Sequence, residues 1–175
     1  ERIDLFGFIS GYEIQKYEEE EEASIKAAQL MADFHNEIAK TGYSGHDLEV
    51  FLVRVLFCLF ADDTGIFQRR HFKNYIEQRT SEDGSDLGSK LLELFDILNQ
   101  PETERQTTLD EQLAAFPYVN GAIFSERIAT ISFDKRGRDH LLKCCTFDWG
   151  GISASIFGSL FQGVLDEGER RQLGA

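Results

Sequence analysis

Several kinds of residue are scarce in this sequence, and each scarcity excludes a class of protein. The 175 residues include 3 Cys, 2 Pro, 1 Met and 1 Trp. Three cysteines without a secretory leader argue against a disulfide framework and indicate a reducing cytoplasm. Two prolines and 15 glycines exclude a collagen-like or linker composition. The longest apolar run, Val55–Ala61, is far shorter than the roughly 20 residues that span a bilayer, so no membrane segment is predicted.

Positive charge is also in short supply. The chain has 18 Lys and Arg against 31 Asp and Glu, a formal net charge of −13. Much of the excess lies in residues 1–50, above all in the run Glu18–Glu22. Net acidity disfavours unaided binding to nucleic acid or to an anionic membrane. We interpret the acidic run as the solvated start of a helix, with docking on a basic partner as the alternative.

What the chain has in abundance is apolar periodicity. Hydrophobic residues make up 42% of the sequence and include 15 Phe, enough for a sizeable core. Apolar residues recur at three- and four-residue steps in seven segments: Ala23–Ile38, Leu48–Phe60, Phe72–Ile76, Leu87–Leu98, Leu109–Phe116, Leu141–Cys145 and Ile156–Leu165. We therefore predict a mainly α, multi-helix globular domain of about seven helices. The segment Leu48–Phe60 is apolar on almost every face, which places it at the centre of the core.

Helix boundaries are predicted from capping residues. Ser44, Ser85 and Ser153 each precede an apolar-periodic segment and are predicted N-caps. The spacing Thr108-x-x-Glu111 is that of a capping box, in which two side chains satisfy two free amides at a helix start.

The pattern changes near residues 118–133. Asn120-Gly121 is a turn dipeptide, and Ile128–Phe133 alternates apolar with small or polar residues. A short β-hairpin or an extended interlude is predicted here.

Short motifs of catalysis and cofactor binding are absent from the sequence. There is no G-x-G, hence no dinucleotide or methyl-donor glycine loop, and no Walker A. Neither proline follows Asn or Asp, which excludes an N-P-P-Y tetrapeptide, and no Lys follows Asp or Glu by two positions, which removes the E-x-K half of a nuclease metal site. No catalytic or cofactor-binding residue is predicted.

Two residue pairs are weak candidates for metal binding. His140 and Cys144 lie four apart on a predicted helix, at most half of a metal site, and core packing or surface placement is favoured. Asp62-Asp63 could chelate a cation or act as paired acids, but their place after a buried helix favours bonds to backbone in a turn. No metal ligand is therefore predicted.

Two small basic clusters could contact DNA phosphates. They are Arg69, Arg70 and Lys73, and Lys135, Arg136 and Arg138. Given the overall acidity, solvated surface is the favoured interpretation of both.

Five ordered strings resemble one family, the MmeI-like (type IIL) restriction-modification enzymes. They are Leu48–Phe67 (LEVFLVRVLFCLFADDTGIF), Arg79–Gly88 (RTSEDGSDLG), Leu109–Phe124 (LDEQLAAFPYVNGAIF), Phe147–Leu165 (FDWGGISASIFGSLFQGVL) and Glu169–Ala175 (ERRQLGA). In that family these strings occur in the helical spacer between an N-terminal nuclease and an adenine-specific DNA methyltransferase.

The resemblance implies a longer parent protein. Such a parent would transfer a methyl group from S-adenosylmethionine to the exocyclic amine of adenine, and would cut DNA with Mg²⁺ if it keeps a nuclease. The absence of an initiator Met fits a piece of a longer chain, with residues 1–22 as a connecting segment and 23–175 as the spacer. The motifs of methyl-donor binding, base flipping and DNA cleavage have no matching positions here.

Three functions follow as hypotheses. The first is a non-catalytic spacer that orients nuclease and methyltransferase modules of the same chain in the cytoplasm, with DNA bound through the parent. The second is a module that contacts the DNA backbone, and the third is an acidic protein-interaction domain.

Overall fold

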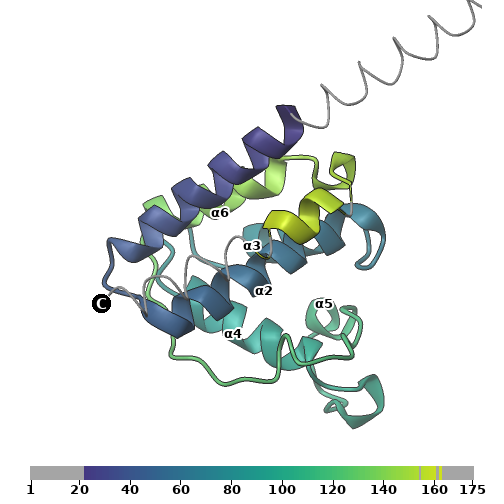
Figure 1. Cartoon of the computed structure of the whole chain (residues 1–175). Coiled ribbons are helices and arrows are strands. Elements are labelled where there is room, and N and C mark those ends of the chain that lie inside the picture. The colour runs from purple at the N-terminus through teal and green to yellow at the C-terminus, as the bar shows by residue number, and fades with distance from the viewer. Residues whose placement is uncertain (1–21, 154, 161, 163–175) are drawn as a thin grey trace, which may run out of the picture.

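The most apolar helix of the sequence lies at the centre of the fold. The computed structural model describes residues 22–153, 155–160 and 162, so most of the Glu18–Glu22 run lies outside the described residues. After a helix over residues 22–39, the elements are α2 (Gly45–Thr64), α3 (His71–Arg79), α4 (Leu87–Leu98), η1 (Glu102–Glu104), α5 (Glu111–Ala114), α6 (Lys135–Thr146) and η2 (Trp149–Gly151). A further helical stretch covers residues 155–160. This part of the chain contains no β-strand, which confirms the mainly α prediction (Figure 1).

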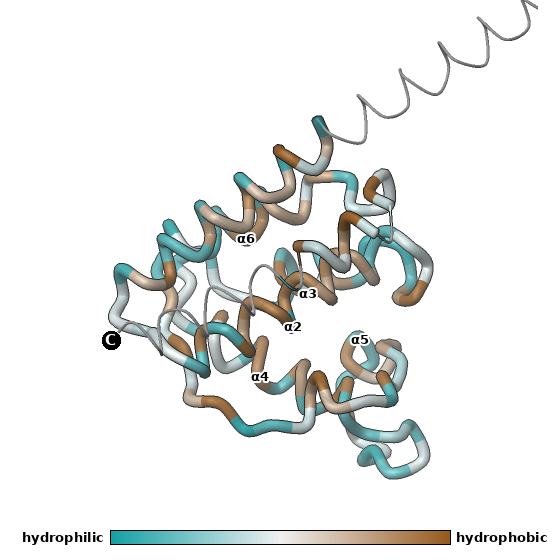
Figure 2. Tube along the Cα trace, in the orientation of Figure 1, coloured by the Kyte–Doolittle hydropathy of each residue, from teal (hydrophilic) through white to brown (hydrophobic). Residues whose placement is uncertain are grey.

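Helix α2 is surrounded by the other elements. Phe51, Val55 and Leu56 are fully buried in a core cluster to which the other helices also contribute. Figure 2 shows apolar residues along α2, while the loop that holds η1 is hydrophilic. The helix ends where Gly65 adopts the left-handed conformation at φ 84°, as expected for a C-terminal glycine. No helix of the described residues is both long and apolar enough to cross a membrane.

The first helix and α6 lie side by side on one face of α2 (Figure 1). Ala27, Phe34 and Ile38 are buried, as the three- and four-residue spacing predicts. Leu141 and Cys144 on α6 belong to the same core cluster. The two helices together therefore close one side of the core.

Two helix starts differ from the predictions. The N-cap of α4 is Asp86 and not Ser85, whose hydroxyl bonds to Asp83 at 2.7 Å. Helix α5 begins after Asp110, whose carboxylate accepts the amides of Gln112 and Leu113, so the predicted capping box at Thr108 does not form. An ionised carboxylate closer to the helix start is a stronger acceptor than a hydroxyl three residues ahead of Glu111.

The other predicted N-caps are in place. Ser44 precedes α2, although its side chain makes no capping hydrogen bond. The Ser153 hydroxyl accepts the Ile156 amide at 3.2 Å, at the start of the stretch 155–160.

Residues 117–134, here called the 117–134 segment, have no regular secondary structure. Of the two forms predicted, the extended interlude is present and the β-hairpin is not. Backbone groups of this segment bond to other elements instead of to a second strand. The Val119 amide donates to Leu98 at 2.8 Å, and the Ala129 carbonyl accepts from the Tyr43 hydroxyl at 2.7 Å.

A close backbone approach seats this segment against α4. A Cβ added at Gly88 would lie 1.7 Å from the Ile131 carbonyl oxygen. Because only glycine leaves this space empty, Gly88 lets the 117–134 segment lie directly on the helix.

Candidate functional site

The paired carboxylates at the end of α2 join three elements. Asp62 is buried, and its two oxygens accept the amides of Phe72 and Lys73 at 2.8 and 3.2 Å, at the start of α3. Burial raises the pKa of Asp62, while these backbone hydrogen bonds oppose the rise. Asp62 thus caps the next helix from a distance of ten residues.

Asp63 joins α2 to η2. Its carboxylate accepts the Trp149 amide at 2.9 Å, and the Trp149 indole donates to the Cys144 carbonyl, also at 2.9 Å. Both acidic side chains therefore bind backbone amides, as favoured, although these amides belong to α3 and η2 and not to a turn beside the pair.

A buried arginine attaches the 117–134 segment to α2. Arg54 is 2% exposed, and its guanidinium donates to the Ile123 carbonyl at 2.8 Å and to the Glu126 carbonyl. The same group lies 5.4 Å from the ring centre of Phe95 and 5.8 Å from that of Phe124. Burial lowers the pKa of Arg54. Because an arginine stays charged in proteins, these carbonyls and rings compensate a buried cation.

A second arginine ties α4 to α5. The Arg105 guanidinium donates to four backbone carbonyls. Those of Ile97 (2.9 Å) and Gln100 (3.1 Å) lie near the end of α4, and those of Ala114 (3.2 Å) and Phe116 (2.6 Å) lie near the end of α5. Carbonyls at a helix end lack partners within the helix, so one side chain satisfies two helix ends at once.

Two members of the predicted basic clusters make similar bonds inside the protein. Arg138 is 7% exposed and donates to the Thr80 hydroxyl at 3.0 Å and to the Ile76 carbonyl at 3.4 Å, which joins α6 to the end of α3. Arg70 donates to the Cys145 carbonyl at 3.1 Å, at the other end of α6.

The remaining members lie nearer the surface. Lys135 and Arg136 have side chains 70% and 71% exposed, paired with Asp139 and Glu37 at 3.0 and 3.1 Å. Lys73 lies 3.9 Å from a Glu77 oxygen. Arg69 is exposed. Contact of either cluster with DNA phosphates stays a prediction, carried by these exposed side chains rather than by Arg138.

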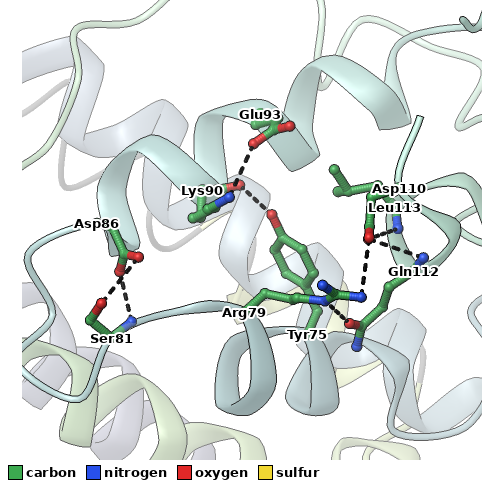
Figure 3. A network of polar contacts seen from close by, with 9 residues as sticks. All are labelled: Tyr75, Arg79, Ser81, Asp86, Lys90, Glu93, Asp110, Gln112 and Leu113. Carbon is green, nitrogen blue, oxygen red and sulfur yellow. Dashed lines mark hydrogen bonds and ion pairs between the residues drawn. The ribbon is translucent and has the colours of Figure 1, made fainter. Parts of the chain in front are cut away.

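A polar network joins α3, α4 and α5 (Figure 3). Arg79 at the end of α3 contacts Asp110 at 3.1 Å and the Gln112 side chain at 2.7 Å, both at the start of α5. The Tyr75 hydroxyl donates to the Lys90 carbonyl of α4 at 3.1 Å. These side chains hold three helix segments in register.

His140 and Cys144 do not converge on a shared site. His140 lies 3.9 Å from Glu37, whereas the Cys144 thiol contacts the Leu30 carbonyl at 3.9 Å. Burial raises the pKa of Cys144 to about 12, so its thiol is a poor nucleophile at neutral pH. The described residues hold no group of three His, Cys, Asp or Glu side chains suited to a metal ion.

Two open cavities lie beside the 117–134 segment. One of about 370 Å³ is lined by Ile38, Ile131 and Phe133, with Glu37 among its polar residues. The other, of about 360 Å³, is lined by polar residues that include Asp96 and Glu126. Both cavities are lined by residues of the 117–134 segment and of the elements packed beside it.

Known proteins resemble this chain both in sequence and in structure. Residues 46–124 match the family model described as "MmeI, helicase spacer domain". The type IIL restriction-modification enzyme MmeI, solved in complex with DNA, has 53% sequence identity to this chain and a TM-score of 0.74 over 80% of it. Residues 46–124 therefore belong to a spacer domain of the MmeI type. The resemblance of the sequence to this family is thereby confirmed.

DNA methyltransferase A of Bacillus subtilis (strain 168) is a further relative of the spacer, 37% identical over 98% of the chain. The chain spans 20% of the length of that relative and 19% of the MmeI chain. Both relatives are therefore much longer proteins, of which the spacer domain is one part.

Two residues that hold the spacer together were missed from the sequence. Arg54 interrupts an apolar run between Val53 and Val55, and a charge within such a run on a largely apolar helix is a signal of a buried, paired group. Arg105 lies among polar residues in the η1 loop, where no local pattern distinguishes it from a solvated side chain.

Proposed function

We propose that the spacer is a rigid, non-catalytic connector that orients a nuclease module and a methyltransferase module of one longer chain. The observation that carries this proposal is the set of side chains that bind backbone groups of distant elements, namely the buried Arg54, Asp62 and Arg138 and the half-buried Arg105. Such bonds resist relative movement of helices, because breaking one leaves a buried carbonyl or charge unsatisfied. Residues 1–22 would link this domain to the module before it, and 23–175 would form the spacer itself.

The longer protein is proposed to be an adenine-specific DNA methyltransferase that also cuts DNA, and we place it in the cytoplasm. S-adenosylmethionine would supply the methyl group, and Mg²⁺ would serve a nuclease. We expect no methyl donor in the spacer, because neither of the two cavities beside the 117–134 segment is lined by a glycine-rich loop. The flanking modules would bind both groups and the DNA.

The first test uses the 175-residue chain alone. Incubated with duplex DNA, Mg²⁺ and radiolabelled S-adenosylmethionine, the folded chain is expected to transfer no label and to leave the DNA intact. Circular dichroism establishes that the chain is folded. Methyl transfer or cleavage by the isolated chain would contradict a non-catalytic role.

The second test uses the longer enzyme. Arg54→Lys removes the paired donors to Ile123 and Glu126 and so loosens the connector. This variant is expected to keep methyl transfer and to spread the positions at which DNA is cut. The exposed change Lys135→Gln is the control, and it should leave a single cleavage position.

A second candidate function is contact with the DNA backbone. The observation that favours it is the exposure of Lys135 and Arg136 side by side at the start of α6. Charge reversal at both positions should then weaken retardation of duplex DNA at low salt and flatten its salt dependence. No retardation by the unaltered chain at low salt would remove this candidate.

A further inference from the structure

Most basic side chains of the described residues are bonded within the protein, either to a carboxylate or to a backbone carbonyl. Within the part of the chain that the structure describes, four lysines and arginines have neither kind of partner, and all four are exposed. They are Lys26, Arg69, Arg127 and Lys143. Such a cation can meet an external anion without first giving up an ion pair.

Three of these four cations belong to segments that meet at the end of α6. Lys143 lies in the last turn of this helix. Lys26, on the first helix, lies 6.0 Å from the ring centre of Phe147, the residue that follows α6. Arg69 precedes Arg70, whose guanidinium donates at 3.1 Å to a carbonyl in the last turn of α6. We call Lys26, Arg69 and Lys143 the basic end of α6.

The dipole of α6 accounts for part of this gathering, because the end of a helix favours nearby cations. Arg70 already meets that need through its bond to the Cys145 carbonyl. The acidic side chains close to the end of α6 are engaged by backbone instead. Asp63 accepts the Trp149 amide at 2.9 Å, and Asp148 accepts the Gly150 amide at 3.0 Å. The basic end therefore presents positive charge beyond what the helix requires.

The start of α6 differs from its end. Lys135 and Arg136 are exposed there, but each pairs with a carboxylate. An acidic stretch, residues 77–111 with ten acidic and three basic side chains, also reaches the start of α6. Its Gly84 lies against the cap of α6, since an added Cβ would overlap the Asp134 carbonyl. Negative charge beside the start of α6 disfavours the approach of a phosphate, and the basic end is more favourable.

We propose that the basic end of α6 binds the phosphate backbone of duplex DNA and is the main DNA contact of the spacer. Phosphates follow one another along a strand, so cations on neighbouring elements can each meet one. The inference rests on the second candidate function, contact with the DNA backbone, and names further residues for it. Lys135 and Arg136 add a weaker contact, because each shares its charge with a carboxylate.

The salt dependence of duplex binding by the 175-residue chain tests this assignment. Arg69→Gln combined with Lys143→Gln removes two cations of the basic end. The slope of the logarithm of the binding constant against that of the salt concentration should then decrease in magnitude by about 2, since each phosphate contact contributes about 0.9. Lys90→Gln combined with Arg127→Gln is the matched control, because it changes the net charge equally on other elements. This control should leave the slope unchanged.

The outcomes separate the inference from the function on which it rests. The pair Lys135→Gln and Arg136→Gln should lower the slope by less than the change at the basic end. A decrease at the basic end no greater than in this pair, or equal to that in the matched control, would overturn the basic end as the main contact while DNA binding stands. No retardation by the unaltered chain would remove the second candidate function itself, and the inference with it. Circular dichroism establishes that each variant is folded.

Crosslinking in the longer enzyme distinguishes DNA from a protein partner. A photo-crosslinking amino acid replaces Lys143 or, as the control, the exposed Glu104 in η1. Figure 1 shows η1 on the opposite side of α2 from α6. In the enzyme bound to duplex DNA, the group at position 143 should attach to DNA and the group at position 104 should not. Attachment from position 143 to a neighbouring module instead of DNA would overturn the inference.

Discussion

Helix α2 and the 117–134 segment touch each other and are stabilised in different ways. Along α2, buried residues such as Phe51, Val55 and Leu56 repeat at helical spacing, and many apolar contacts together stabilise the helix. The 117–134 segment has no regular hydrogen-bond ladder. It buries Phe124, Ile128 and Ile131 in the core, and single groups hold its backbone in place, chiefly Arg54, Tyr43 and Gly88. The helix should therefore tolerate conservative changes, and the segment should not.

The largest expected effect is at the close approach to α4. Gly88→Ala places a methyl group 1.7 Å from the Ile131 carbonyl oxygen, and this backbone must move away. The free energy of unfolding in urea should fall by about 3 kcal/mol. Gly158→Ala is the matched control, because a Cβ there meets nothing within 4 Å and alanine favours a helix by about 1 kcal/mol. Equal losses in both variants would contradict the role of Gly88.

The next effect is at the buried guanidinium. Arg54→Lys keeps the charge. The lysine ammonium group cannot make the pair of hydrogen bonds that the planar guanidinium makes with the Ile123 and Glu126 carbonyls. Leaving a carbonyl unsatisfied should lower the free energy of unfolding by about 2 kcal/mol. Arg136→Lys, at a 71% exposed side chain, is the control and should have no measurable effect. A neutral Arg54→Lys would show that the 117–134 segment does not need this contact.

A smaller effect is expected one half-turn along α2. Leu56→Met conserves volume in a fully buried site, and such changes typically cost less than about 1.5 kcal/mol. Thermal or urea unfolding of this variant should show a loss below that of Arg54→Lys. A greater loss from Leu56→Met would reverse the comparison between the helix and the segment.

The smallest effect involves Tyr43, whose hydroxyl donates to the Ala129 carbonyl at 2.7 Å. Tyr43→Phe should lower the free energy of unfolding by about 0.5 kcal/mol at neutral pH. Burial raises the pKa of Tyr43 from 10.0 to about 12, so ionisation opposes folding. The stability that Tyr43 contributes is present below pH 10 and is lost as the pH rises through about 12.

Unfolding measured at alkaline pH distinguishes the ionisation of Tyr43 from the general loss of protein stability at high pH. Between pH 10 and 12, the wild-type protein should lose stability more steeply than Tyr43→Phe. Tyr118→Phe, at an exposed side chain, serves as the control and should follow the wild type. Parallel curves for wild type and Tyr43→Phe would exclude the raised pKa as a cause.

Apolar periodicity predicted the helices because burial of a helix face leaves a three- and four-residue spacing in the sequence. The end of α2 at Gly65 was predicted for a similarly local reason. Bonds from Asp62 and Asp63 to backbone were predicted too, but their partners at the start of α3 and in η2 were not. The cap of α5 was not predicted, because the capping-box spacing pointed to Thr108, whereas the nearer carboxylate of Asp110 takes the free amides.

The basic clusters show that a local sequence pattern does not predict which arginines are buried. Arg136 and Arg138 are two residues apart, yet the first is exposed and the second is buried against α3. The side of α6 that meets α3 depends on packing of elements far apart in the sequence. A single sequence without that packing cannot distinguish a solvated arginine from one that bonds to a helix end.

Hydrogen exchange of the 117–134 segment tests the central claim, that a segment without regular structure is held as firmly as the helices around it. The Val119 amide donates to the Leu98 carbonyl and the Ala129 amide to the Asp47 carboxylate, at 2.8 and 3.1 Å. Both amides should exchange slowly in the wild type, and Ala129 should exchange faster in Arg54→Lys. Exchange of both amides at the rate of an unstructured peptide in the wild type would contradict a rigid connector.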